Sequence, residues 1–241
     1  MQPNLQYLTA NPPTGLAIGF ALTTALTLLG FMMAVRQAAP RISGIILIGL
    51  IAWLFVLGTL ASQGFFTTLN TKPPRLFLAV GPPLLLIAGL FVSRSGRRFL
   101  AGLPLSTITY LHTIRIVVEL VLYGLYVNHQ IPELMTFEGR NFDILAGLTA
   151  PILAYFSFNR PILSKRWLFV WNIAALLLLI NIIIHAILSA PSPFQQLAFE
   201  QPNVGILKFP FIWLPGFVVP VVLLCHLVVL CLNRDLYDFA D

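Results

Sequence analysis

Charged residues are scarce in this chain, since only 9% of its 241 residues are Asp, Glu, Lys or Arg, against 58% hydrophobic residues. Soluble domains carry about 25% charged residues. Apolar runs of about 20 residues, long enough to cross the hydrocarbon of a bilayer, recur along the sequence, and its mean hydropathy is +0.90. We therefore predict a single all-α transmembrane domain over residues 1–241, with the lipid bilayer as its main partner. Its sequence lacks the alternating segments of about ten residues that are typical of membrane barrels.

Cysteine and the common catalytic motifs are also scarce. The two cysteines, Cys225 and Cys231, point about 120° apart on a helix, so neither a disulfide nor a zinc ribbon is indicated. The sequence has no G-x-S-x-G or H-E-x-x-H motif. The missing motifs favour a protein without enzymatic activity but leave the question open, and we predict no cofactor. A haem or metal held by His112 and His226 is the alternative.

Seven apolar runs are long enough to be membrane crossings, which predicts a bundle of seven helices. They cover residues 14–35, 42–62, 76–93, 106–128, 142–158, 167–189 and 211–232. Pro82, Pro83 and Pro151 lie inside two of these runs, where proline is tolerated in membranes and favours kinks.

The basic residues explain the net charge of +6 through topology rather than nucleic-acid binding, because cytoplasmic loops are rich in Lys and Arg. With the N-terminus outside and the C-terminus in the cytoplasm, nine basic residues face inward: Arg36, Arg41, Arg94, Arg97, Arg98, Arg160, Lys165, Arg166 and Arg234. The outer loops hold four: Lys72, Arg75, Arg140 and Lys208. This bias predicts a multi-pass cell-membrane protein with no nucleic-acid partner.

The fourth run carries polar side chains on one face. At 100° per residue, an arc of about 80° contains His112, Arg115, Glu119, Tyr123 and Tyr126. An ionised side chain facing lipid costs from about 2.5 to over 10 kcal/mol, so this face is expected to point into the bundle. Arg115 and Glu119 are four residues apart and can pair, but a guanidinium has more donors than one carboxylate accepts.

Depth along the antiparallel runs suggests further partners. His112 and His226 lie at the same level, roughly 9 Å from the cytoplasmic edge at 1.5 Å per residue. Asn181 matches the level of Glu119, and His185 lies one turn beyond Asn181. We therefore predict a polar core in two layers, whose members are His112, Arg115, Glu119, Tyr123, Asn181, His185 and His226.

A second group of charges precedes the fifth run. Glu138, Arg140 and Asp143 are predicted to form a gate or ligand rim above the polar core. The alternative is an ordinary helix start, in which Asn141 or Asp143 caps the first turn.

These residues leave three functional hypotheses. The leading one is an intramembrane site, centred on Arg115 and Glu119, that binds or conducts a small polar ligand, an ion or a proton, with histidines that titrate near neutral pH as proton carriers. The second is a structural or interaction protein whose buried polar groups only fix helix packing. The third is a membrane redox protein that uses His112 and His226.

The segments MTFEGRNFDILAGLTAP and FPFIWLPGFVVPVVLLCHL, together with the R-x-x-x-E of the fourth run, are similar to a group of small uncharacterised bacterial membrane proteins with several crossings. The resemblance covers the second half of the chain. It implies a bacterial inner membrane and brings no known activity, cofactor or catalytic residue.

Overall fold

The computed structural model describes residues 2–69 and 71–232, without the side chain of Lys165. The predicted tail with Arg234 lies outside these residues. The helices are α1 (Thr14–Ala38), α2 (Ser43–Ser62), α3 (Phe77–Val92), α4 (Arg94–Ala101), α5 (Leu105–Leu111), α6 (Ile114–Val127), α7 (Asp143–Ala154), α8 (Lys165–Ser189) and α9 (Val219–Leu232). Two π-helical turns, η2 (Tyr155–Asn159) and η4 (Leu214–Val218), and two 3₁₀ turns, η1 (Glu133–Met135) and η3 (Gly205–Leu207), complete them. Within the described residues there is no strand, which confirms the all-α class.

Five helical segments are long and apolar enough to cross a membrane, and the bent pair of α3 and α4 raises this number to six within the described residues. The fifth predicted crossing, 142–158, is divided into α7 and η2 around Pro151, so the count of seven stays a prediction. Large apolar side chains point outward on the crossing helices: Phe55 is 72% exposed and Leu85 75%. Such an apolar surface fits a lipid environment.

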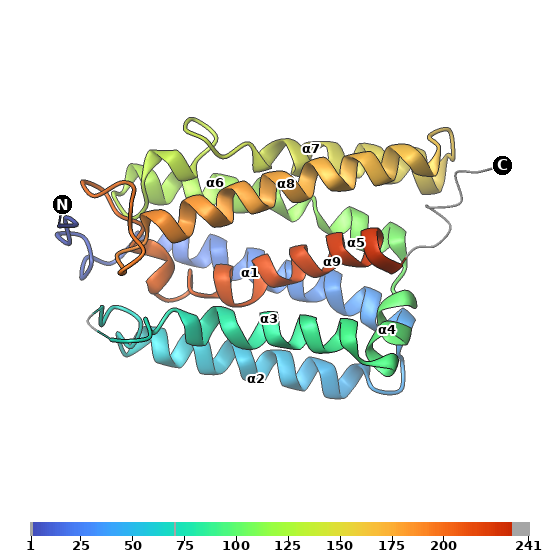
Figure 1. The fold of residues 1–241 in the computed structure, drawn as a ribbon, viewed down its shortest axis with the longest axis horizontal. Coiled ribbons are helices and arrows are strands. Elements are labelled where there is room, and N and C mark those ends of the chain that lie inside the picture. The colour runs from blue at the N-terminus through green and yellow to red at the C-terminus, as the bar shows by residue number, and fades with distance from the viewer. Residues whose placement is uncertain (1, 70, 233–241) are drawn as a thin grey trace.

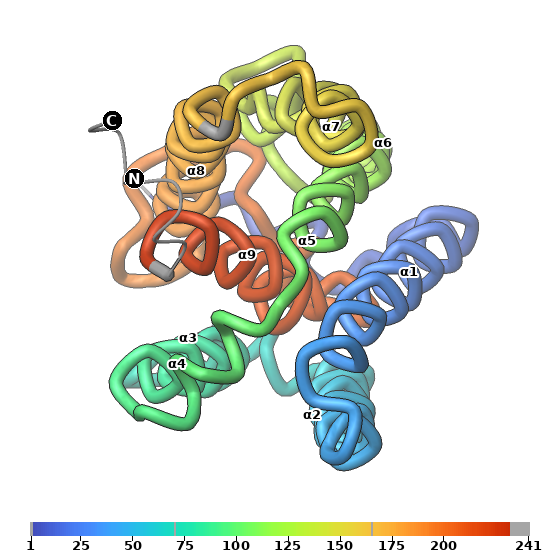
Figure 2. The backbone as a smooth tube through the Cα atoms, turned by 90° about the vertical axis from the view of Figure 1, so that its right-hand side faces the viewer, coloured from blue at the N-terminus to red at the C-terminus, as the bar shows by residue number. Residues whose placement is uncertain are grey.

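Apart from α4, the helices run roughly along the long axis of the molecule (Figure 1). Seen from the end that carries α4, α9 lies between α8 and α3 (Figure 2). Helix α6 packs between α1 and α7. At Gly124 a Cβ atom would lie 2.4 Å from Cδ2 of Leu16, so α1 and α6 approach closely because this position has no side chain.

Two tryptophans link α2 to the turn η4. The Nε1 of Trp53 donates to the carbonyl of Gly216 at 2.9 Å, and the Nε1 of Trp213 donates to the carbonyl of Leu54 at 2.8 Å. The π turn alters the ordinary backbone pairing, and an indole N–H supplies a buried carbonyl with a donor. This reciprocal pair fixes the start of the last crossing against α2.

The loops opposite α4 form a cap that holds the N-terminal segment. Lys208, only 8% exposed, donates to the carbonyls of Tyr7 and Ala10 at 2.6 and 2.5 Å and to Oε1 of Gln130 at 2.5 Å. The ring of Tyr7 also stacks on His129 at 4.9 Å. The N-terminal segment is therefore bound to both long loops of this end.

The cap carries a pH dependence through Lys208. Burial lowers the pKa of its ammonium from 10.5 to about 8, because burial disfavours the charged form. Below about pH 8 the folded and unfolded chains both hold this proton. Between pH 8 and 10.5 only the unfolded chain does, so the free energy of unfolding is expected to rise with pH, by at most about 1.4 kcal/mol per unit. When the free energy of unfolding is measured across this pH range, the rise should be absent in Lys208→Met. An unchanged pH slope in that variant would contradict the assignment of the rise to Lys208.

Candidate functional site

The fourth predicted crossing is interrupted in its first third, between α5 and α6. Helix α5 ends at Leu111 and α6 begins at Ile114, and the backbone between them changes to short-range pairing, with the N–H of His112 donating to Thr109 and that of Arg115 donating to His112. Seven polar side chains gather around this break, each no more than 5% exposed: His112, Arg115, Glu119, Asn141, Asp143, Asn172 and His226. We call them the polar cluster.

Arg115 is the best-bonded member of the polar cluster. Its Nε donates to Oδ2 of Asp143 at 2.7 Å, and its Nη2 donates to Oδ1 of the same carboxylate. Nη2 also reaches the carbonyl of Ala175 at 3.1 Å, and Nη1 lies 3.1 Å from Nε2 of His226. Four of the five donors of a guanidinium are thus used. A bidentate pair of this kind fixes both the charge and the orientation of Arg115.

Gly147 brings Asp143 within reach of Arg115. Asp143 and Gly147 are four residues apart on α7 and therefore lie on the same face of that helix. A Cβ atom on Gly147 would lie 2.8 Å from the backbone nitrogen of Ile116, so α7 lies directly against the first turn of α6. This close approach is possible only where the residue has no side chain.

His226 is held by Asn172 from α8. Its Nδ1 lies 2.7 Å from Oδ1 of Asn172, and Nδ2 of Asn172 donates to the carbonyl of His226 at 2.9 Å. An amide oxygen only accepts, so Nδ1 carries the proton. Nε2 is therefore the acceptor of the bond from Arg115. Both ring nitrogens of His226 are engaged, and the surrounding bonds fix one neutral tautomer.

His112 is buried without polar partners. Its ring stacks on His226 with 4.1 Å between centroids and 27° between planes, and Trp171 contacts it edge-on at 5.6 Å. Neither of its ring nitrogens has a hydrogen-bond partner among the described residues. Buried polar atoms are paired in the great majority of cases, so the two unpaired ring nitrogens of His112 are an exception in this core.

Only one of the two carboxylate oxygens of Glu119 has a hydrogen-bond partner among the described residues. Its Oε1 accepts from Nδ2 of Asn141 at 2.6 Å, while its Oε2 has no partner among the described residues. Asn141 is itself fixed, because its amide also donates to Met135 and its oxygen accepts from the N–H of Asp143. One carboxylate oxygen of Glu119 thus remains open beside a rigid neighbour.

The sequence-predicted residues divide into those inside and those outside the polar cluster. His226 contacts His112 and Arg115 as the depth argument predicted. Asn181 instead donates to the carbonyl of Arg140 at 2.9 Å, and His185 bonds the carbonyl of Asn181 on its own helix. The physical reason is the inward fold of the loop before α7, which puts Asn141 against Glu119 where Asn181 was expected.

The three residues predicted to form the outer rim also separate, because one is buried in the polar cluster and two are exposed. Asp143 was expected at the rim, but it is 5% exposed and pairs with Arg115. Glu138 and Arg140 are exposed. Tyr123, which was predicted in the polar core and not at the rim, is half-buried and stacks on Phe137 with 5.0 Å between the ring centroids.

Sequence reasoning missed Asn172, and it considered Asn141 only as a helix cap. Asn172 and Asn181 are nine residues apart, which places them about 180° apart on α8. Only one of them can face the α6 side. Asn172 is the polar residue on the face of α8 opposite Asn181, but the sequence does not determine how α8 is rotated about its own axis.

The predicted alternative of a bis-histidine haem does not fit this geometry. An axial pair needs two free ring nitrogens that point at one iron from opposite sides. Here the rings of His112 and His226 stack face to face, and both nitrogens of His226 are bonded to protein. Among the described residues, no three His, Cys, Asp or Glu side chains are grouped as a metal site.

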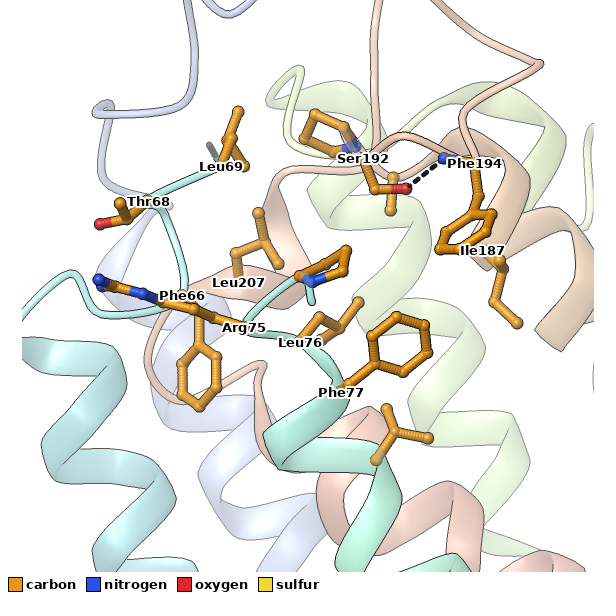
Figure 3. A pocket seen from close by; sticks show the side chains of 14 residues that line it. Phe66, Thr68, Leu69, Arg75, Leu76, Phe77, Ile187, Ser192, Phe194 and Leu207 are labelled. Atoms are coloured by element: carbon orange, nitrogen blue, oxygen red, sulfur yellow. Dashed lines mark hydrogen bonds between the residues drawn. The ribbon is translucent and has the colours of Figure 1, made fainter. Parts of the chain in front are cut away.

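A surface groove of about 100 Å³ lies between the loop before α3 and the end of α8 (Figure 3). Phe66, Leu76, Phe77, Ile187 and Phe194 line it, with Arg75 at its side. No member of the polar cluster lines this groove, so it does not lead to Glu119 or His112.

Residues 73–233 match the family described as a domain of unknown function, DUF8737. The chain belongs to this family. The predicted resemblance to an uncharacterised family is thereby confirmed. The DUF8737 region contains the whole polar cluster, whereas α1 and α2 precede it. No curated protein and no solved structure matches the chain.

Proposed function

We propose that this DUF8737 chain is a multi-pass membrane protein whose polar cluster binds and releases protons inside the membrane. The proposal keeps seven crossings, an outer N-terminus, a cytoplasmic C-terminus and a bacterial inner membrane. The excess of basic residues in the loops at the α4 end supports this orientation. The wider class is a protein that binds or conducts a small polar ligand, an ion or a proton.

One observation carries the proposal. Two buried ionisable side chains on the same crossing, His112 and Glu119, leave three polar atoms without partners among the described residues, and they lie on either side of the saturated ion pair of Arg115. Ionisable groups inside membranes are costly and usually mark proton or ion paths. Interruption of a crossing at such a site is also typical of transport proteins.

A proton suits this site better than another ion. Arg115 and Asp143 neutralise one another, so the guanidinium is not free to attract an anion. The open atoms are the two ring nitrogens of His112 and one carboxylate oxygen of Glu119; the unprotonated ring nitrogen and the carboxylate oxygen can each accept a proton. His226 is held in a single tautomer, and its ring stacks on that of His112.

The test uses substitutions that keep shape and remove proton chemistry. Glu119→Gln keeps an oxygen that accepts from Asn141, and His112→Phe keeps the ring that stacks on His226. Each is expected to lower proton flux into dye-loaded proteoliposomes by about 100-fold or more, the usual size of a lost proton-transfer group. Both variants should unfold at the same temperature as the original protein.

Glu138→Gln removes a carboxylate from the exposed outer loop and serves as the matched control, with unchanged flux. Wild-type flux in both shape-preserving variants would overturn the proposal. The second candidate, a purely structural network, is favoured by the four hydrogen bonds of Arg115 and by the engagement of both ring nitrogens of His226. In that case the protein itself would show no flux above empty vesicles, and Glu119→Gln would change only the unfolding temperature.

A further inference from the structure

Helix α4 turns away from the membrane-crossing direction. The axes of α3 and α4 differ by 94°, and α4 lies across the end of the bundle in Figure 1. If α3 runs along the membrane normal, α4 lies parallel to the membrane surface at the level where the crossing ends. Helices in this position present one face to lipid headgroups.

The turn before α4 is fixed by specific bonds. Oγ of Ser93 accepts from the N–H of Gly96 at 3.0 Å, which caps the helix start. A Cβ atom on Gly96 would lie 2.3 Å from the carbonyl oxygen of Leu90, so only glycine fits. Nη1 of Arg97 donates to the carbonyls of Phe91 and Val92 at 3.0 and 2.9 Å. The position of α4 is therefore built into the fold.

The side chains of α4 separate into two faces. Leu100 is completely buried against the bundle and Phe99 is half-buried. Arg94 and Arg98 are exposed and lie four residues apart, on the same face. No ion pair involves either arginine within the described residues.

Among the described residues, the charged side chains around α4 are all basic. The loops and helix ends on this side carry Arg36, Arg41, Arg94, Arg97, Arg98, Arg160, Lys165 and Arg166. The five acidic residues of the described chain are Glu119 and Asp143 in the polar cluster and Glu133, Glu138 and Glu200 in the opposite loops. The described part of the chain thus offers no carboxylate at this end to neutralise Arg94 and Arg98.

We propose that α4 is an interfacial helix whose Arg94 and Arg98 bind the headgroup of an anionic phospholipid. The geometry carries this inference, because two neighbouring guanidiniums face outward from a helix that lies in the plane where phosphates lie. Arginine binds phosphate in bidentate fashion. This site is independent of the polar cluster and of the proton proposal.

The experiment measures bound lipid directly. Purified protein in detergent micelles is titrated with phosphatidylglycerol or phosphatidylcholine, and the lipid-bound fraction is counted by native mass spectrometry. Phosphatidylglycerol is expected to bind in preference to phosphatidylcholine, and added salt should weaken it. Each arginine near an anionic surface contributes about 1 kcal/mol, so Arg94→Gln/Arg98→Gln should weaken binding about 30-fold.

Two further variants distinguish the possible outcomes. Arg94→Lys/Arg98→Lys keeps the charge and should bind phosphatidylglycerol more tightly than the glutamine pair, which excludes misfolding as the cause. Arg41→Gln/Arg160→Gln removes the same charge from the same end and should retain the wild-type affinity. Equal loss in this control would assign the binding to the general charge of this end and overturn the site at α4. Equal binding of the two lipids would overturn it as well.

Discussion

Replacing Asp143 with alanine is expected to destabilise the protein by about 3–5 kcal/mol, because it leaves the charge of Arg115 buried without its carboxylate. Arg115 is 3% exposed and has no second carboxylate bonded to it in the described chain. Its remaining bonds go to a backbone carbonyl and to His226, which are weaker acceptors. The measurement is the free energy of unfolding by titration with a denaturing detergent in mixed micelles.

Two comparisons make this result specific. Glu138→Ala removes a carboxylate from the loop that precedes α7, but its side chain is exposed, so its effect should stay within about 0.5 kcal/mol. Arg115→Met/Asp143→Leu removes both charges and should recover much of the stability lost in Asp143→Ala, because an apolar pair has no buried charge to compensate. If the double variant were as unstable as Asp143→Ala, loss of packing rather than an unpaired charge would explain the defect.

The sequence predicted one face of the polar cluster and, of the four other residues of this cluster, only His226. Helical periodicity alone places His112, Arg115 and Glu119 on one side of the fourth crossing, whatever surrounds it. His226 follows from depth, because antiparallel crossings of similar length bring residues at equal depth to the same level. These two features depend only on local geometry and topology, which explains why a single sequence is sufficient for them.

The partners from α8 and α7 depend on tertiary packing instead. Depth favoured Asn181, yet the rotation of α8 turns Asn172 toward His226. Asp143 was expected at the surface, since it follows a long polar loop. That loop folds inward, and Asn141 reaches Glu119, so α7 begins inside the bundle. Neither the rotation of a helix nor the path of a loop is visible in hydrophobic periodicity.

Gly147→Val is expected to be the second most disruptive substitution, with a loss of about 3 kcal/mol in the free energy of unfolding. The first side-chain atom would lie 2.8 Å from the backbone nitrogen of Ile116 and 3.3 Å from the carbonyl carbon of Arg115. Since backbone atoms cannot rotate away, α7 has to move outward. Asp143, one turn earlier, moves with it, so the ion pair to Arg115 should lengthen. Unfolding in mixed micelles measures the loss, as for Asp143→Ala.

Gly89→Val in α3 is the matched control, because no heavy atom lies within 4 Å of the position that its Cβ would take. It should change the free energy of unfolding by less than about 1 kcal/mol. Truncating Ile116 to alanine in the Gly147→Val background separates side-chain from backbone crowding. It removes the side-chain Cγ1 atom at 2.8 Å but leaves the nitrogen at the same distance, so stability should not return. Full recovery in this double variant would mean that α7 rests on the Ile116 side chain and not on the backbone beside Arg115.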